Sequence, residues 1–281
     1  MMKIKLLRKD IFLVCGIVGV VVGIAGGSYV YLGEATWGLA ATLVGVIIVA
    51  LLLENRRRVQ ERSQDVQESV DDSYSQVDAL LSVRGELDVT EAFPATRGWA
   101  ASPDFLRELT RIIRLHSPRH IVEAGSGVST LIAALALEKY GGGRVLALEN
   151  GKEFANRTRE YLKLHGLQQN AKVAHSPTTE YQVENKYIEW YDIAALKKVD
   201  QIDLLVVDGP PALENSRARW PALPLLRDQL GNGAKNLLDD GDREGENQII
   251  DDWCRRYGMN KTYIPWEKGA YLLKFQHDKT S

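Results

Sequence analysis

The feature that most constrains the fold is a short stretch at residues 120–137. A β-branched run ending in Glu123 and Ala124 is followed by Gly125 and Gly127, and then by an apolar, small-residue run. This order describes a strand that turns sharply into a helix. At such a turn the backbone amides of the helix start meet a nucleotide-like ligand, and glycine leaves room for it. The stretch predicts a nucleotide-binding loop, with a tight turn that binds nothing as the alternative.

Strand and helix patterns alternate along residues 95–281, as in an α/β domain with a parallel sheet. The expected strands are near-continuous apolar runs at residues 120–124, 144–149, 171–175, 202–208 and 234–239. The first expected helix begins at Ser102 and Pro103, an N-cap followed by a first-turn proline. The others are expected at residues 130–140, 152–165, 187–198, 219–230 and 244–257.

The last strands have a different pattern. Residues 261–266 and 270–276 are separated only by a three-residue turn that ends in Gly269, which predicts an antiparallel hairpin. The domain is therefore expected to be a Rossmann-like, seven-stranded, mostly parallel sheet with a C-terminal antiparallel hairpin.

Ligands of such sheets bind beside the carboxyl ends of the strands, near the point where the winding direction reverses. The side chains expected there are those of residues 123–127, Glu149, His175, Asp208, Asp239 and Asp240. Glu149 follows the glycine pair by about 25 residues, where a carboxylate can accept hydrogen bonds from both hydroxyls of a ribose. The loop and Glu149 together predict a ligand that contains adenosine.

The N-terminal 53 residues have the composition of a membrane segment. Residues 11–32 and 35–53 carry no charge, and each run is close to the ~20 residues that cross a bilayer. Lysine and arginine flank the outer ends, whereas the only charged residue in the connection between the runs is Glu34. The positive-inside rule therefore predicts a two-span transmembrane hairpin, with both termini and the α/β domain in the cytoplasm. A cleaved signal peptide is the alternative for the first run.

Residues 54–94 are expected to form a helical stalk and linker. Residues 54–83 contain no glycine or proline, and Val59, Val66, Val70, Val77 and Leu81 fall on one helical stripe. The stalk either pairs with a second copy of the chain or continues the second span as a solvated helix. Glycines at four-residue spacing in the first span, a close-packing pattern, are a second place where copies could associate.

Charge and cysteine content exclude several classes. The chain has 35 basic and 37 acidic residues, so it lacks the excess positive charge of a nucleic-acid-binding domain. Its two cysteines, Cys15 and Cys254, lie far apart in unlike surroundings. They provide neither a disulfide framework nor a zinc site.

Four motifs resemble class I S-adenosylmethionine-dependent methyltransferases. The first motif of that family is similar to Val122-Glu123-Ala124-Gly125-Ser126-Gly127-Val128-Ser129-Thr130. Residues 205–211 (LVVDGPP), 219–223 (RWPAL) and 237–246 (LLDDGDREGE) are similar to one bacterial and archaeal subgroup. The resemblance covers roughly residues 99–275. Thr130 stands where a dehydrogenase would have a third glycine, which disfavours a nucleotide-dependent oxidoreductase.

The resemblance implies S-adenosylmethionine as cofactor. Glu123 and the loop that follows would hold its methionine part, Glu149 its ribose, and His175 and Ser176 would border the adenine. The acid or amide that usually follows the third strand is missing. The full set of expected cofactor contacts is Glu123, Gly125, Ser126, Gly127, Ser129, Thr130, Glu149, His175, Ser176 and Asp208.

Asp208, Asp239 and Asp240 end adjacent strands beside the expected methyl donor, and such carboxylates repel unless a cation or protons intervene. Catechol O-methyltransferase and its relatives place Mg²⁺ on acids at these strand ends, where the ion lowers the pKa of a substrate hydroxyl. Gly241 stands where those enzymes carry an amide ligand. In the alternative, Asp208 or Asp240 is itself the general base, and Arg243 pairs with the acids or binds an anionic substrate group.

Two further interpretations concern the acceptor side. Arg217 and Arg219 are expected on one rim of the acceptor pocket, where they either meet an anionic substrate group or only solvate a helix start. His175 is either a second candidate base or a hydrogen-bonded wall residue.

The expected function is a membrane-anchored methyltransferase that transfers a methyl group to oxygen. Its expected acceptor is a small molecule, a glycan or a lipid-linked compound. The alternative is a catalytically inactive membrane scaffold that binds the cofactor or a nucleotide.

Overall fold

The computed structural model describes residues 16, 19, 20, 23, 35–183, 185–210 and 217–276. The chain divides into two compact units, Met1–Asp71 and Asp72–Ser281. Each unit is described by itself.

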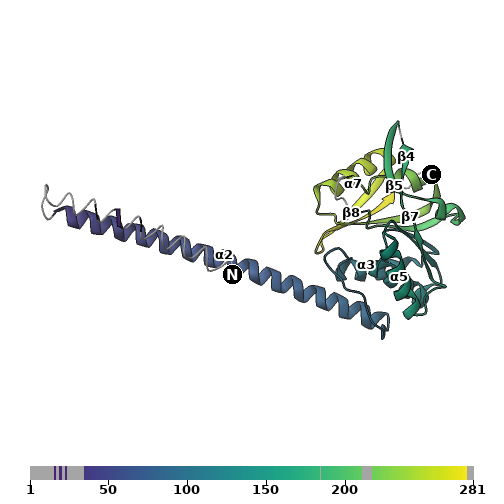
Figure 1. The fold of residues 1–281 in the computed structure, drawn as a ribbon, viewed down its shortest axis with the longest axis horizontal. Helices are drawn as coiled ribbons and strands as arrows, with labels where there is room; N and C mark the ends of the chain where they lie inside the picture. The colour runs from purple at the N-terminus through teal and green to yellow at the C-terminus, as the bar shows by residue number, and fades with distance from the viewer. Residues whose placement is uncertain are drawn as a thin grey trace. The chain divides into compact units, whose positions relative to one another are not determined.

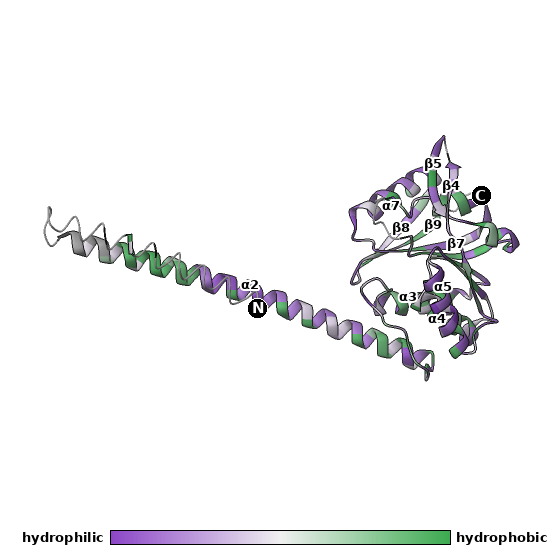
Figure 2. Ribbon diagram, in the orientation of Figure 1, coloured by the Kyte–Doolittle hydropathy of each residue, from purple (hydrophilic) through white to green (hydrophobic). Residues whose placement is uncertain are grey.

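The first unit is dominated by the start of α2, a 52-residue helix over Ala35–Glu86. Figure 2 shows the described turns of this helix changing from hydrophobic to hydrophilic along its length. Apolar side chains such as Leu43, Val46 and Leu52 are exposed there. Further along, ion pairs one turn apart stabilise the helix, as between Arg57 and Glu61.

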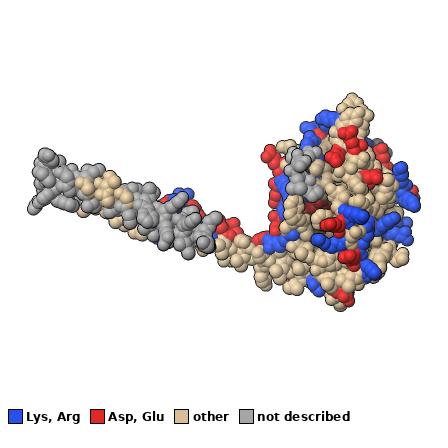
Figure 3. Space-filling view, in the orientation of Figure 1, with Lys and Arg blue, Asp and Glu red and all other residues tan. Residues whose placement is uncertain are grey.

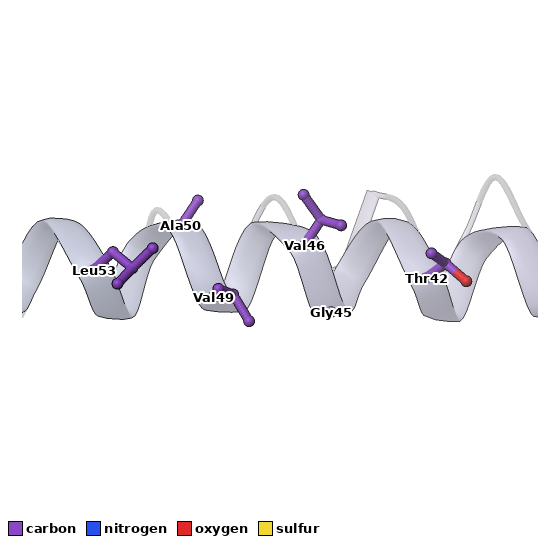
Figure 4. Close-up of a pocket in the computed structure, with 6 residues that line it drawn as sticks. All are labelled: Thr42, Gly45, Val46, Val49, Ala50 and Leu53. Atoms are coloured by element: carbon purple, nitrogen blue, oxygen red, sulfur yellow. The ribbon is translucent and has the colours of Figure 1, made fainter.

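An apolar hollow of about 490 Å³ lies along the same part of α2. Figure 4 shows the residues that line it, which are Thr42, Gly45, Val46, Val49, Ala50 and Leu53. Among the residues that the structure describes, no helix combines the length and apolar character needed to cross a membrane. The first expected span, residues 11–32, falls outside the described residues apart from four positions, so the transmembrane hairpin stays a prediction.

The expected second span and stalk are parts of this single helix, which continues to Glu86. The predicted apolar stripe faces solvent, because its five members, Val59, Val66, Val70, Val77 and Leu81, are 55–64% exposed. Within the second unit α2 buries another face, formed by Gln76, Ala79 and Val83. The compact unit therefore begins at Asp72, earlier than the expected domain boundary at residue 95.

The second unit is built on a seven-stranded sheet in the order β3-β2-β1-β6-β7-β9-β8. Its strands are β1 (His120–Ala124), β2 (Arg144–Glu149), β3 (Ala171–His175), β6 (Ile202–Val207), β7 (Leu230–Asp239), β8 (Met259–Ile264) and β9 (Ala270–Phe275). All neighbours pair in parallel except β9, which is antiparallel to both β7 and β8. The predicted sheet with its C-terminal antiparallel hairpin is confirmed. The winding direction reverses between β1 and β6, so ligand chemistry is expected at their carboxyl ends.

Helices cover both faces of this sheet. On one face lie α3 (Pro103–His116), α4 (Val128–Tyr140) and α5 (Lys152–Leu164), and on the other lie the short α6 (Ala222–Leu226) and α7 (Glu244–Tyr257) (Figure 1). Neighbouring strand residues alternate between the two cores, so Ile121 packs with the first group of helices and Val122 with the second. The near-continuous apolar strands follow from this burial on both faces.

Two predicted helices are wrong. Residues 187–198 begin instead with strand β5 (Lys186–Tyr191), which pairs with β4 (Thr178–Val183) in a two-stranded sheet, and a 3-10 turn at Ala194–Lys198 follows. The aromatic and β-branched residues of β5 suit a strand, and Asn185 supplies the positive φ of 62° that the hairpin turn needs.

Residues 219–230 form only α6 and a 3-10 turn at Arg227–Gln229. Pro221 and Pro224 lack the amide hydrogens that a longer helix would use.

Candidate functional site

The glycine loop after β1 lies against the end of β6. Gly125 has a φ of 113°, which residues with a side chain rarely adopt, and a Cβ there would lie 3.5 Å from the Asp208 carbonyl carbon. The loop then enters α4, whose first turn holds the buried Ser129 and Thr130. The expected strand-turn-helix arrangement is therefore present, with its first glycine required by the backbone.

Thr130 connects this helix start to Glu123. Its Oγ1 accepts a hydrogen bond from the Gly127 amide at 3.1 Å and donates one to Glu123 Oε2 at 2.5 Å. Burial raises the pKa of Glu123 to about 7, although the hydroxyls of Ser129 and Thr130 lower it. Glu123 Oε1 is buried and has no hydrogen-bond partner among the described residues. A buried acceptor held in this way fits a donor group of the cofactor.

Glu149 is oriented by the same loop. Its Oε2 accepts a hydrogen bond from Ser126 Oγ and its Oε1 accepts one from the Gly151 amide, both at 2.9 Å. Each carboxylate oxygen keeps a second lone pair, so both can still accept from a ribose diol. Ser126 thus joins the glycine loop to the acid that ends β2, and this pair fits an adenosine-containing cofactor.

The two residues expected to border the adenine, at the end of β3, differ in their burial. Ser176 is buried, and its amide donates to the Glu149 carbonyl at 2.7 Å, whereas His175 is exposed. Three inter-strand steps, or about 14 Å, separate β3 from β6. His175 is therefore too far across the sheet to act as a base beside Asp208.

The structure brings together the three acids that end β6 and β7. Oxygens of Asp208, Asp239 and Asp240 all lie within 4.8 Å of one another. Asp239 and Asp240 are buried, while the Asp208 side chain is 17% exposed and is the most open of the three. Asp208 is thus the acid best placed to meet a substrate.

Arg219 lies among these acids, with its side chain only 3% exposed. Its Nη2 donates to Asp240 Oδ2 at 2.5 Å, and its Nη1 donates to the Asp239 carbonyl at 2.7 Å. The Arg219 guanidinium also forms ion pairs with Asp208 at 3.6 Å and with Glu246 at 3.8 Å. The expectation that Arg219 is exposed on a pocket rim is wrong, because the segment that carries it packs into the core through Trp220.

Arg243 approaches the cluster from outside. Its side chain is 52% exposed and its Nη1 lies 2.9 Å from Asp240 Oδ2. The first of its two expected roles, pairing with the acids, is the one that the geometry shows. Arg217 pairs with Asp252 at 3.1 Å, on α7.

Burial and mutual repulsion set the protonation of the cluster. The pKa of Asp239 is raised well above its ordinary value by burial and by the charges of Asp208 and Asp240. Burial also raises the pKa of Asp208, to about 6, because Arg219 offsets only part of the effect. A carboxylate with this pKa is largely ionised near pH 7 and suits a general base.

The residues as arranged do not fit a divalent ion. Mg²⁺ prefers six oxygen ligands, yet Asp240 Oδ2 is already held by two arginines and Gly241 contributes no side-chain ligand. A divalent ion about 5 Å from a guanidinium is repelled by roughly 7 kcal/mol at an effective dielectric constant of about 20. The unpaired buried oxygens Asp239 Oδ2 and Asp240 Oδ1 are compatible with a proton on Asp239.

Tyr191 is a site residue that the sequence patterns missed. Its hydroxyl lies so close to Gly209 that a Cβ there would collide with it. Its pKa is raised well above the usual value by burial and by the charges of Glu149 and Asp208, so it remains a donor. Tyr191 was placed in a helix that the structure replaces with β5, and no other sequence signal connected it with the loop.

Comparisons with known proteins agree with this geometry. A sequence model of a family described as a methyltransferase domain matches residues 122–241. The fold is similar to that of the S-adenosylhomocysteine-bound Podospora anserina methyltransferase PaMTH1, with a TM-score of 0.54, 16% identity, and coverage of 75% of this chain and 96% of that chain. The N-terminal domain of human METTL16, in complex with S-adenosylhomocysteine, gives a TM-score of 0.50 and 15% identity over 72% of this chain and 82% of that chain.

No curated protein matches the sequence. At 15–16% identity the two structures show a shared fold. The family match covers the part of the chain that holds the strands whose ends carry the site, and the family is described as a methyltransferase domain.

Proposed function

We propose that this protein is an S-adenosylmethionine-dependent methyltransferase that transfers a methyl group to an oxygen atom. The observation that carries the proposal is the continuous set of contacts from Glu123 through Thr130 and Gly127 to Ser126 and Glu149. This set orients two buried acids around one loop. The backbone of Asp208, the most open acid of the neighbouring cluster, packs against the same loop at Gly125.

When bound, the cofactor supplies a methyl group activated by a positively charged sulfur. Glu123 and the amides of the loop would hold its methionine part, Glu149 would hold the ribose, and Ser176 would border the adenine. Asp208 would accept the proton that the acceptor hydroxyl loses on methylation. The proposal that the acceptor atom is oxygen therefore rests on Asp208, whose carboxylate would serve as the base.

We further propose that the chain is anchored in a membrane with the enzyme domain in the cytoplasm. The uncharged runs at residues 11–32 and 35–53 and the exposed apolar side chains at the start of α2 support this. An anchored enzyme would meet glycan or lipid-linked acceptors at a high local concentration, besides small molecules. Both signs of charge are mixed over the face shown in Figure 3, which gives no support for a nucleic-acid partner.

A scaffold without catalysis is the other candidate. The intact glycine loop, Glu149 and the strand-end acids disfavour it, because a binding module has no use for an open carboxylate with a raised pKa beside the cofactor.

Calorimetric titration of the detergent-solubilised full chain with S-adenosylhomocysteine tests the cofactor assignment. We expect saturable binding that weakens at least tenfold in Glu149→Ala and is unchanged in Glu160→Ala, an exposed glutamate on α5. Equal binding by both variants would exclude the assignment. Binding without transfer of labelled methyl groups to any membrane lipid or glycan extract would favour the scaffold.

A further inference from the structure

We propose, on the basis of the function proposed above, that Arg219 takes the place of a divalent cation at the ends of β6 and β7. Methyl transfer by this chain would then need no metal ion. Arg219 acts as a positioning residue, because it holds the carboxylates of the reacting site without touching the acceptor itself.

The contacts of Arg219 reach the same groups that a bound cation would join. Its guanidinium donates to the carbonyls of Asp239 at 2.7 Å and Asp208 at 3.3 Å, and to the Asp240 carboxylate at 2.5 Å. It also lies 3.6 Å from a carboxylate oxygen of Asp208 and 3.8 Å from one of Glu246. One cation therefore connects the ends of two strands with the first turn of α7.

The buried position of Arg219 is fixed by the residues behind it. The adjacent Trp220 donates from its indole nitrogen to Asp252 at 2.7 Å, and its carbonyl accepts a hydrogen bond from Trp253 at 3.1 Å. Asp252 and Trp253 both belong to α7. The backbone at residue 219 is thus held against the core, and this places the Arg219 side chain beside the acids at the ends of β6 and β7.

An arginine suits this position better than a lysine. The planar guanidinium presents several donors at once, and the contacts to two carbonyls and two carboxylate groups use that geometry. The same arrangement leaves the Asp208 carboxylate as the most open acid of the cluster. Arg219 therefore supplies the positive charge that keeps the acids together, while Asp208 remains available to take the proton.

The test is a Mn²⁺ titration of the solubilised full chain, followed by electron paramagnetic resonance. We expect no specific Mn²⁺ site in the unmodified protein and a new site in Arg219→Ala, where the acids lose their cation. The new site should bind Mn²⁺ at least tenfold more tightly than any nonspecific binding to the unmodified protein. Arg227→Ala, which removes an exposed arginine from the neighbouring turn, should gain none. A Mn²⁺ site in the unmodified protein that Asp239→Asn removes, or no gain in Arg219→Ala, would overturn the proposal.

Three additional measurements keep the test decisive. If Arg219→Ala fails to fold, as judged by circular dichroism, Arg219→Gln replaces it, and the same gain of a metal site is required. S-adenosylhomocysteine titrations of the same samples separate failure of this proposal from failure of the proposed function. Chelation of divalent ions should leave methyl transfer by the unmodified protein within about twofold of its untreated rate.

Discussion

At the scale of single residues, buried ionisable side chains decide how the site responds to pH. Glu123 and Asp208 have pKa values raised by burial to about 7 and about 6. Both therefore change charge within one or two pH units of neutrality, and burial and the neighbouring acids also raise the pKa of Asp239 well above its ordinary value. Glu123 and Asp208 are therefore both expected to make stability depend on pH, and Asp208 is expected to make activity depend on pH as well.

Glu123→Gln tests the effect on stability. The pKa of Glu123 is 4.5 in an ordinary setting and about 7 in the fold, so the folded state binds its proton more tightly. This stabilisation is complete below about pH 4.5 and is lost as the pH rises through 7, a change of about 3 kcal/mol. Urea unfolding at several pH values should show a larger loss in the unmodified protein than in Glu123→Gln, which keeps only the contribution of the other acids with raised pKa values, such as Asp208. Glu160→Gln is the control, and equal pH dependence in all three proteins would contradict the assignment.

Asp208→Asn tests the proposed base. An amide cannot accept the hydroxyl proton, so methyl transfer to a membrane lipid extract should fall by about 10²–10⁴-fold. In the unmodified protein the rate should fall below about pH 6, where Asp208 is protonated. Asp228→Asn alters an exposed acid and should leave the rate unchanged. Unimpaired methyl transfer by a folded Asp208→Asn would exclude this residue as the base.

The sequence could indicate that the strand-end acids need positive charge, but not which residue provides it. Like charges brought together by the strand order require a cation or protons, and that much follows from Asp208, Asp239 and Asp240 alone. The choice of Arg219 depends on Trp220 packing against α7, more than 30 residues later in the chain. Such long-range packing leaves no local pattern, so Arg219 and Arg217 look equivalent in the sequence.

At the scale of elements, the predictability of each strand follows its burial. β1, β2 and β3 were predicted to the residue, because parallel strands covered on both faces are apolar throughout. The β4–β5 hairpin is mostly exposed, with only Trp190 and Tyr191 buried in β5, and the apolar spacing of β5 fits one side of a helix as well as a strand. Tyr191 was missed for that reason, since its position in the site depends on β5 being a strand.

The last turns of α2 belong to the compact unit that begins at Asp72, and Gln76→Ala tests this. Gln76 is buried, and its side chain donates to Asp104 at 2.8 Å at the start of α3. Removing the amide leaves a buried carboxylate oxygen with one partner fewer, which should lower the free energy of unfolding of this domain by about 1–3 kcal/mol. Gln67→Ala, the same change at an exposed position of the same helix, should cost less than about 0.5 kcal/mol. Equal effects in chemical denaturation would show that α2 does not contribute to the domain.

At the scale of the whole molecule, one helix carries two kinds of surface. Its first described turns expose apolar side chains, and its last turns belong to the compact unit that begins at Asp72. Exposed leucines and valines in a row are unfavourable in water and favourable in hydrocarbon. Fractionation of cells that express the chain therefore tests the proposed anchor.

We expect the full chain to remain in the membrane pellet after alkaline extraction, because buried apolar helices do not depend on charge for their attachment. A chain that begins at Asp72 should move to the supernatant and still bind S-adenosylhomocysteine, since it keeps every residue of the proposed cofactor site. As a matched control, a chain that begins at Ala35 keeps only the second apolar run and shows whether that run anchors the protein alone. Recovery of the full chain in the supernatant would contradict the anchor and leave the cofactor site untouched, because the two proposals rest on separate units of the molecule.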